Sequence, residues 1–396
     1  KGKARKAHNS NYLKRVNNIL IGLKGSQSKL LRKKGKEMVV SETDKMTSFS
    51  PLIKKRRAIR VSEKALIRTD RLEGLTYPLV VEPTIEGLNL ASWAESNERF
   101  IQAHLNKYGA ILFRGFRLPE IDDFEHFVRV SGGEPLSYTE RSSPRSQVNG
   151  KVYTSTDHPA AYPIFLHNEQ SYNQTFPTRI YFHCRFASKV GGSTPLADTR
   201  RVFSRLSTET RERFEQLGYM YVRNFGEVFG LSWQTAFQTS SPSEVEAYCR
   251  ANGIHYEWKD RGHLRTWQVR RVTARHPISG EPIWFNHATF FHISTLEPPL
   301  PKQVVDEFGE DALPNQTYYG NGEAIPVEVL RELREAYLAE KISFPWRDGD
   351  VLMLDNLLCA HGREPYAGKR RVLVSMAKPC AWSQLEKVAT GGCNEQ

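Results

Sequence analysis

Cysteine is scarce in this chain. Five cysteines stand among 396 residues, and no two of them have the spacing of a CxxC motif. An odd number of thiols in a chain this long excludes the small disulfide-stapled domains, and no spacing is typical of a zinc finger. We therefore expect a reducing, cytoplasmic setting. The five thiols belong to Cys184, Cys249, Cys359, Cys380 and Cys393.

Long apolar runs are also missing. No segment approaches the roughly 20 apolar residues that a membrane-spanning helix needs. No amino-terminal stretch joins a basic region to a short apolar core and a small-residue cleavage site. These absences predict a soluble chain that is not exported and has no membrane partner. Because the chain begins with Lys1 rather than methionine, we expect a processed chain or a domain of a longer one.

Acidic residues are scarce only near the amino terminus. Residues 1–70 hold 20 Lys and Arg against 5 Asp and Glu, whereas the other 326 residues hold 36 against 39. The net charge of +12 therefore belongs to an amino-terminal arm with basic clusters at 33–36 and 54–57. Such clusters can bind nucleic acid or an acidic protein surface, but no aromatic residues are interleaved to stack on bases. We predict that residues 1–60 form a basic linker or a partly disordered arm.

The rest of the chain has the composition of a folded domain, with 39% apolar and 11% aromatic residues overall. Many short β-rich runs are bounded by Gly and Pro, and a few amphipathic helices lie between them. This pattern predicts a mainly β protein with flanking helices, α+β in class, with a double-stranded β-helix (jelly roll) as its core. We expect one domain over residues 61–396. Residues 231–265 and 300–345 are predicted to be insertions, a lid or helical segments, and residues 90–108 a helix.

One closely spaced pair of residues points to metal chemistry. His167 and Glu169 stand two apart in a run, 165–169, that is typical of a strand. Because strand side chains alternate between faces, both could reach one ion, although such a pair also arises by chance. A lone His361 follows an apolar strand near the other end of the chain, with His292 as the alternative third ligand. Two histidines and a carboxylate can fill one face of an octahedral iron(II) and leave three positions open.

Two arginines and a hydroxyl suggest how a co-substrate is held. Arg370 and Arg371 open a strand after His361, and an arginine there offers a bidentate fork to the far carboxylate of a dicarboxylic keto acid. Neighbouring strand residues face opposite ways, so one of the two should be an exposed strand terminus. Thr194 follows a double glycine and could donate a hydrogen bond to the same carboxylate, or it could simply be a turn residue.

In four ordered segments the sequence resembles the taurine dioxygenase superfamily of iron(II)/2-oxoglutarate enzymes. More narrowly, it looks like the clavaminate-synthase-like, syringomycin aspartyl-hydroxylase-like branch. The resemblance covers roughly residues 66–380 and leaves the arm outside. Its segments are His167-Asn168-Glu169-x-Ser171-Tyr172, Gly191-Gly192-Ser193-Thr194-Pro195-Leu196-Ala197-Asp198, residues 284–292, and Leu354-Asp355-Asn356 through His361-Gly362-Arg363.

The resemblance implies an iron(II) site with a 2-oxoglutarate site beside it. The implied iron ligands are His167, Glu169 and His361, and the implied 2-oxoglutarate residues are Thr194 and Arg370, with Arg371 as the alternative. It further implies that iron(II), 2-oxoglutarate and O2 together yield succinate, carbon dioxide and an oxidant for an unactivated C–H bond. Halogenases of related fold have a small residue in place of the ligand carboxylate, so Glu169 counts against halogenation.

Members of this branch often work beside nonribosomal peptide synthetases. The resemblance thus implies hydroxylation of an amino acid, free or tethered to a peptidyl carrier protein, in secondary-metabolite or antibiotic biosynthesis. Three alternatives stay open: a desaturase or cyclase using the same iron chemistry, a protein or nucleic-acid oxygenase or demethylase, and a non-catalytic jelly-roll binding module. A near-neutral domain makes a nucleic-acid partner the weaker expectation. Candidate substrate contacts, some of which could equally be structural, are Arg145, Tyr153, Asn286 and His287.

Overall fold

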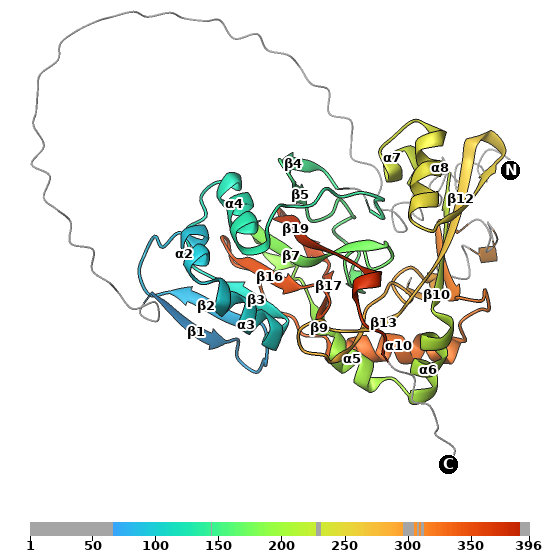
Figure 1. Ribbon diagram of the computed structural model, residues 1–396. Helices are drawn as coiled ribbons and strands as arrows, with labels where there is room; N and C mark the ends of the chain where they lie inside the picture. The colour runs from blue at the N-terminus through green and yellow to red at the C-terminus, as the bar shows by residue number, and fades with distance from the viewer. Residues whose placement is uncertain are drawn as a thin grey trace, which may run out of the picture.

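The computed structural model describes residues 66–143, 145–226, 231–295, 305–306, 309 and 313–388. The predicted arm at 1–60 lies outside the described residues, as do both ends of the predicted domain and part of the segment 300–345. The largest sheet has eight strands in the order β1-β2-β3-β16-β7-β19-β5-β4 (Figure 1). Their bounds are β1 Ile67–Arg71, β2 Leu79–Pro83, β3 Ala110–Phe113, β16 Val351–Asp355, β7 Thr175–Phe186, β19 Arg371–Ala381, β5 Val152–Thr154 and β4 Gln147–Asn149.

A second, smaller sheet faces the first and completes the jelly roll. Its three antiparallel strands are β6 (Ile164–His167), β17 (Cys359–Arg363) and β9 (Leu196–Asp198), in that order. The short pair β8 (Val190–Gly191) and β18 (Tyr366–Ala367) lies in the connections beside it. Buried side chains from both sheets form one hydrophobic core. The predicted jelly-roll core with flanking helices is confirmed.

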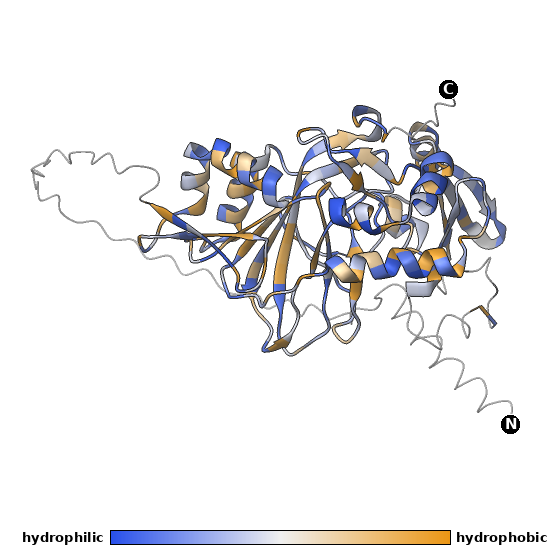
Figure 2. Ribbon diagram, turned by 90° about the horizontal axis from the view of Figure 1, so that it is seen from below, coloured by the Kyte–Doolittle hydropathy of each residue, from blue (hydrophilic) through white to orange (hydrophobic). Residues whose placement is uncertain are grey.

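Strand alternation places the outer face of the large sheet against helices. Leu112 on β3 belongs to the core between the sheets, whereas Ile111 and Phe113 pack toward the helices. These helices are α2 (Leu90–Ser96), α3 (Glu98–Tyr108) and α4 (Ile121–Gly132). Figure 2 shows their hydrophobic residues alternating with hydrophilic ones. The single helix predicted over 90–108 is wrong, because the Asn97 amide donates to the Trp93 carbonyl at 2.8 Å and breaks the run there.

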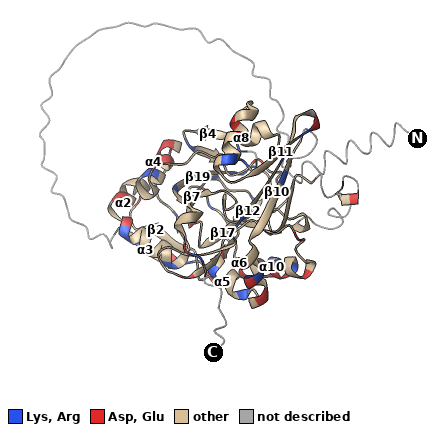
Figure 3. Cartoon of the chain, turned by 45° about the vertical axis from the view of Figure 1, so that its right-hand side comes forward, with Lys and Arg blue, Asp and Glu red and all other residues tan. Residues whose placement is uncertain are grey.

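A four-stranded sheet, in the order β11-β12-β10-β15, stands beside the jelly roll. The predicted insertion at 231–265 forms α7 (Trp233–Phe237), α8 (Pro242–Ala251), β11 (His255–Lys259) and the first residues of β12 (His263–Arg270). Around this sheet, Figure 3 shows charges of both signs on the outer helices α6 and α10. None of the described helices has the length and apolarity needed to cross a membrane. The other bounds are β10 Tyr219–Phe225, β13 Thr273–Arg275, β14 Pro282–Trp284, β15 Asn315–Tyr319, α5 Thr199–Arg205, α6 Thr208–Leu217 and α10 Val327–Glu340.

Candidate active site

The two predicted histidine ligands lie on neighbouring strands of the small sheet. His361 on β17 is the direct antiparallel partner of His167 on β6. Their ring centroids are 4.6 Å apart, and both side chains are buried. The register therefore joins two residues that are 194 positions apart in the sequence, as the metal hypothesis requires.

Glu169 reaches the same place from a turn rather than from a strand. The strand predicted over 165–169 is wrong at its end, because β6 stops at His167 and Gln170 has a φ of 55°. Asn356 fixes the turn: its Oδ1 accepts from the Glu169 backbone N–H at 2.8 Å, and its Nδ2 donates to the Glu169 carbonyl at 2.9 Å. A side-chain amide thus replaces the ladder hydrogen bonds that a strand would have made.

The chemistry of the three side chains fits an iron(II) ion. The ligand atoms of His167, Glu169 and His361 lie within 4.8 Å of one another, close enough for small side-chain rotations to bring them to one ion. Burial lowers the pKa of both imidazoles, which keeps them in the neutral form that binds metals. Because a carbonyl can only accept, the contact of 2.9 Å with the Phe165 carbonyl places a proton on Nδ1 of His167 and leaves its Nε2 lone pair available.

Arg145 is the one predicted substrate contact that lies at the triad. Its Nη2 donates to Oε2 of Glu169 at 2.6 Å, and both side chains are buried. The guanidinium also lies over the ring of Tyr138 at 4.6 Å. Burial alone would lower the pKa of Arg145, but the charge of Glu169, its hydrogen bond and the nearby Tyr138 together more than offset this effect and raise that pKa above its ordinary value.

Thr194 and Arg370 line a cavity whose wall also contains His167, Glu169 and His361. Thr194 is buried, and its hydroxyl accepts from the Trp346 indole N–H at 3.1 Å. The Nε of Arg370 donates to the Gly192 carbonyl at 2.9 Å. Arg371 begins β19 and is exposed, so the structure brings only the first of the two arginines to the cavity.

The remaining candidate contacts lie behind the cavity wall. Tyr153 packs in the core, and its hydroxyl accepts from the backbone N–H of Tyr138 at 3.3 Å. The Asn286 amide donates to the Val272 carbonyl at 3.1 Å. His287 is hydrogen bonded to the Ser171 hydroxyl at 2.6 Å. None of these three described residues lines the cavity.

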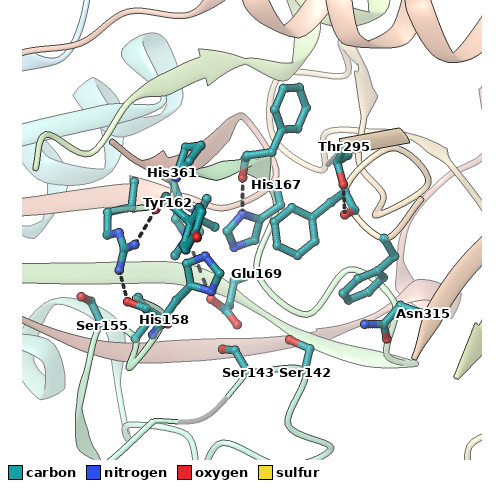
Figure 4. Close-up of a pocket in the computed structure, with 18 of the residues that line it drawn as sticks. Ser142, Ser143, Ser155, His158, Tyr162, His167, Glu169, Thr295, Asn315 and His361 are labelled. Atoms are coloured by element: carbon teal, nitrogen blue, oxygen red, sulfur yellow. Dashed lines mark hydrogen bonds and ion pairs between the residues drawn. The ribbon is translucent and has the colours of Figure 1, made fainter. Parts of the chain in front are cut away.

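The cavity has a volume of about 290 Å³ and opens between the jelly roll and the four-stranded sheet. Figure 4 shows His167, Glu169 and His361 near the middle of the view, with Ser142 and Ser143 below them and Thr295 and Asn315 to the right. Sequence reasoning missed lining residues that include Ser142, Ser143, His158, Tyr162, Phe290, Thr295, Asn315, Arg334 and Arg363. Phe290 and Arg363 stand in two of the segments that carry the family resemblance, but no pattern assigned them to the cavity, and no motif marked the other residues.

A buried polar network holds the loop that carries Arg145. Glu140 has a φ of 47°, and its backbone carbonyl accepts from the Tyr172 hydroxyl at 2.9 Å. Its carboxylate accepts from the Tyr248 hydroxyl at 3.0 Å and lies 3.8 Å from a guanidinium nitrogen of Arg223. Burial raises the pKa of Glu140. The network ties α8 and the four-stranded sheet to the cavity loop, which sequence spacing could not reveal.

Comparisons with known proteins show the family of this chain. The family described as taurine catabolism dioxygenase TauD, TfdA family matches residues 72–377. The dapdiamide synthesis protein DdaC of Enterobacter agglomerans is 42% identical over 316 residues, which is 77% of this chain and 96% of that protein. A clavaminate synthase-like protein of Arabidopsis thaliana is 27% identical over 325 residues, covering 77% of this chain and 95% of the relative. Among solved structures, PvcB of Pseudomonas aeruginosa is 18% identical with a TM-score of 0.47, covering 78% of this chain and 90% of that one.

Proposed function

Because the chain belongs to the taurine catabolism dioxygenase TauD, TfdA family, we propose that it hydroxylates an unactivated C–H bond of an amino acid in secondary metabolism. The enzyme is a dioxygenase that uses iron(II), 2-oxoglutarate and O2. The proposed substrate class and setting are supported by its similarity to DdaC, a protein of dapdiamide synthesis. When bound, iron(II) and 2-oxoglutarate would activate O2, which supplies the oxidising power for breaking the C–H bond.

The observation that carries the proposal is the convergence of His167, Glu169 and His361 in the wall of one cavity that also contains Arg370. We assign the first three as iron ligands. Arg370, helped by Thr194, would hold the far carboxylate of 2-oxoglutarate through charge-assisted hydrogen bonds. The remaining length of the cavity would position one C–H bond of the substrate and exclude water.

The assignment of the ligands is tested without turnover. Iron(II) and 2-oxoglutarate added anaerobically to the full chain should give a weak visible charge-transfer band. Glu169→Ala should lose this band, whereas Glu215→Ala, on the outer helix α6, should keep it. A band of equal strength in both variants, or none in the unaltered protein, would reject the proposed iron site.

The reaction is tested by succinate release over a panel of free amino acids, N-acylated amino acids and carrier-bound thioesters. Hydroxylation adds one oxygen atom to the product, which mass spectrometry detects. A product lighter than the substrate by two hydrogen atoms would indicate desaturation or cyclisation by the same centre and reject hydroxylation. No succinate with any substrate would favour a binding module.

We further propose that the substrate can be tethered to an acidic carrier protein that the basic residues 1–60 attract electrostatically. Deletion of those residues should lower turnover of the carrier-bound substrate in a salt-dependent way and spare the matching untethered one. Equal loss on both substrates would discard this role. A cytoplasmic location belongs to the same proposal, supported by the four described cysteines, all of which are free.

A further inference from the structure

The carboxylate of Glu169 is held by a single arginine. Asn356 fixes the backbone of the glutamate, but the bonds of its side chain can still turn. Within the described part of the chain, Arg145 is the one residue that donates a hydrogen bond to this carboxylate, from Nη2 to Oε2 at 2.6 Å. The same oxygen lies 3.9 Å from Nε2 of His361, another proposed iron ligand. Arg145 therefore sets the direction in which the carboxylate faces the proposed metal site.

Arg145 has little freedom to leave the glutamate. The residue is 8% exposed, and its Nε and Nη1 are buried without a hydrogen-bond partner. Among the described residues, Glu169 is its only ion-pair partner. A guanidinium that turned away would be a buried cation without a counter-charge, which is a costly state. We therefore expect the pair to persist when a metal is bound.

A buried aromatic ring also holds the guanidinium. The guanidinium carbon of Arg145 lies 4.6 Å from the centroid of the Tyr138 ring. Tyr138 is buried, and its carbonyl accepts from the side-chain amide of Gln238, at the end of α7, at 2.8 Å. Its hydroxyl accepts from the backbone N–H of Ser142, in the loop that leads to the arginine, at 3.3 Å. The arginine is thus fixed by a supported ring as well as by the ion pair.

We propose that Arg145 is a positioning residue of the iron site rather than a substrate contact: it orients the Glu169 carboxylate toward the metal and withdraws negative charge from it. Orientation should tighten iron binding, because the carboxylate need not be ordered when the metal arrives. Withdrawal of charge should make the carboxylate a weaker electron donor to iron(II). This inference rests on the proposed iron(II)/2-oxoglutarate function and adds a residue to its machinery.

The first measurement is the affinity of the full chain for iron(II) alone. Anaerobic titration should show about tenfold weaker binding in Arg145→Gln. Arg145→Lys should give an intermediate affinity, because lysine keeps the charge but not the planar fork. Arg331→Gln, at an exposed position of α10, is the control and should bind iron(II) as the unaltered protein does. Binding in Arg145→Gln that is as tight as in the control, or tighter, would overturn the proposal.

The second measurement is the wavelength of the charge-transfer band, with each variant saturated anaerobically with iron(II) and 2-oxoglutarate. The transition moves an electron from iron to the keto acid, so a carboxylate that donates more strongly to iron lowers its energy. Arg145→Gln should shift the band to longer wavelength, by more than any difference between the unaltered protein and Arg331→Gln. Arg145→Lys should shift it less. A residue that only supports the fold would weaken the band without moving it, so an unmoved band in Arg145→Gln would also overturn the proposal.

The unaltered protein separates this inference from the proposed function. If it gives no band with iron(II) and 2-oxoglutarate, the proposed function fails. If it gives the band, but substitution of Arg145 changes neither the iron affinity nor the wavelength, only the positioning role fails. Should Arg145→Gln not fold, Arg145→Lys decides: weaker iron binding with a band at longer wavelength supports the role, and unaltered values overturn it.

Discussion

The two walls of the cavity are built in different ways. We call the first the iron-side wall and the second the far wall. The iron-side wall consists of His167, Glu169, Thr194, His361 and Arg370, and the far wall of Ser142, Ser143, Thr295 and Asn315. The first set is carried by strands of the jelly roll or by the turns directly beside them, whereas the second comes from a loop, a single 3-10 turn (Ile293–Thr295) and the first residue of β15. The difference indicates that one wall is shaped for a fixed chemistry and the other for a particular substrate.

The largest effect should come from the ion pair beneath the iron-side wall. Asp355 and Arg179 are buried and 2.7 Å apart, and His276 also contacts the aspartate. Asp355→Asn should lower the free energy of unfolding at pH 7 by about 3–5 kcal/mol, because it leaves the guanidinium without its partner. Urea unfolding of both proteins measures the difference, and a loss below about 1 kcal/mol would contradict this account.

The loss of stability in Asp355→Asn should depend on pH. Burial alone would raise the pKa of Asp355, but the charge of Arg179 and the hydrogen bond from His276 hold that pKa at about 2. The folded-state pKa is thus below the unfolded value of about 3.9, so the contribution is present above that value and disappears as the pH falls toward 2. The difference in the free energy of unfolding between Asp355→Asn and the unaltered protein should therefore become smaller as the pH falls from 5 to about 2. A constant difference would show that the charge is not its source.

The next effect concerns the amide that locks the glutamate turn. Asn356→Ala leaves the Glu169 N–H and the carbonyls of Glu169 and Pro177 without their bonds at 2.7–2.9 Å. We expect a loss of about 2–4 kcal/mol in stability and about tenfold weaker iron binding, measured by anaerobic titration. Asn321→Ala, in an exposed turn, is the control. Reduced stability with unaltered iron affinity would show that Asn356 only supports the fold.

A third prediction separates the two adjacent arginines. Arg370→Gln should raise the KM for 2-oxoglutarate about ten- to a hundredfold, because it removes a charge-assisted hydrogen bond of about 1.5–3 kcal/mol. The matching exposed change, Arg371→Gln, should leave that KM nearly unaltered. Steady-state succinate release measures both values. Equal effects in the two variants would mean that β19 is shifted by one residue when the co-substrate is bound.

The smallest effect is expected in the far wall. Ser143→Ala should change the substrate KM only about two- to fivefold, the range of a single neutral hydrogen bond. The KM for 2-oxoglutarate and the melting temperature should stay the same, in contrast to the iron-side variants. If Ser143→Ala instead weakened 2-oxoglutarate or iron binding, the division of the cavity into two walls would not hold.

The residues of the iron-side wall could be named from the sequence, but their spacing alone did not decide them. His167 and Glu169 are two apart, a pair that also arises by chance, and the full ligand set and the choice of Arg370 over Arg371 came from the family resemblance. Even there, the turn at Glu169 was missed, because it depends on a hydrogen bond from Asn356. That contact spans 187 positions, and no local pattern encodes it.

The loops around the cavity were not predictable in the same way. Arg145 was named as a contact, but its position depends on Glu140, whose partners come from α8 and the four-stranded sheet. Tyr153 was taken as a possible contact and lies in the core, because aromatic residues on short strands can face either side. Loop side chains obey no period, and tertiary packing decides their place.

The loops of the far wall also have a consequence for protein engineering. Residues 292–295 and 313–315 border the cavity without supplying a proposed iron or 2-oxoglutarate contact. Libraries randomised at these two segments should yield enzymes with new substrate preferences at little risk to oxygen chemistry, whereas libraries in β6 or β17 should yield mostly inactive proteins. Nature could have used the same freedom, diversifying a biosynthetic repertoire by editing loops while leaving the oxidising centre untouched.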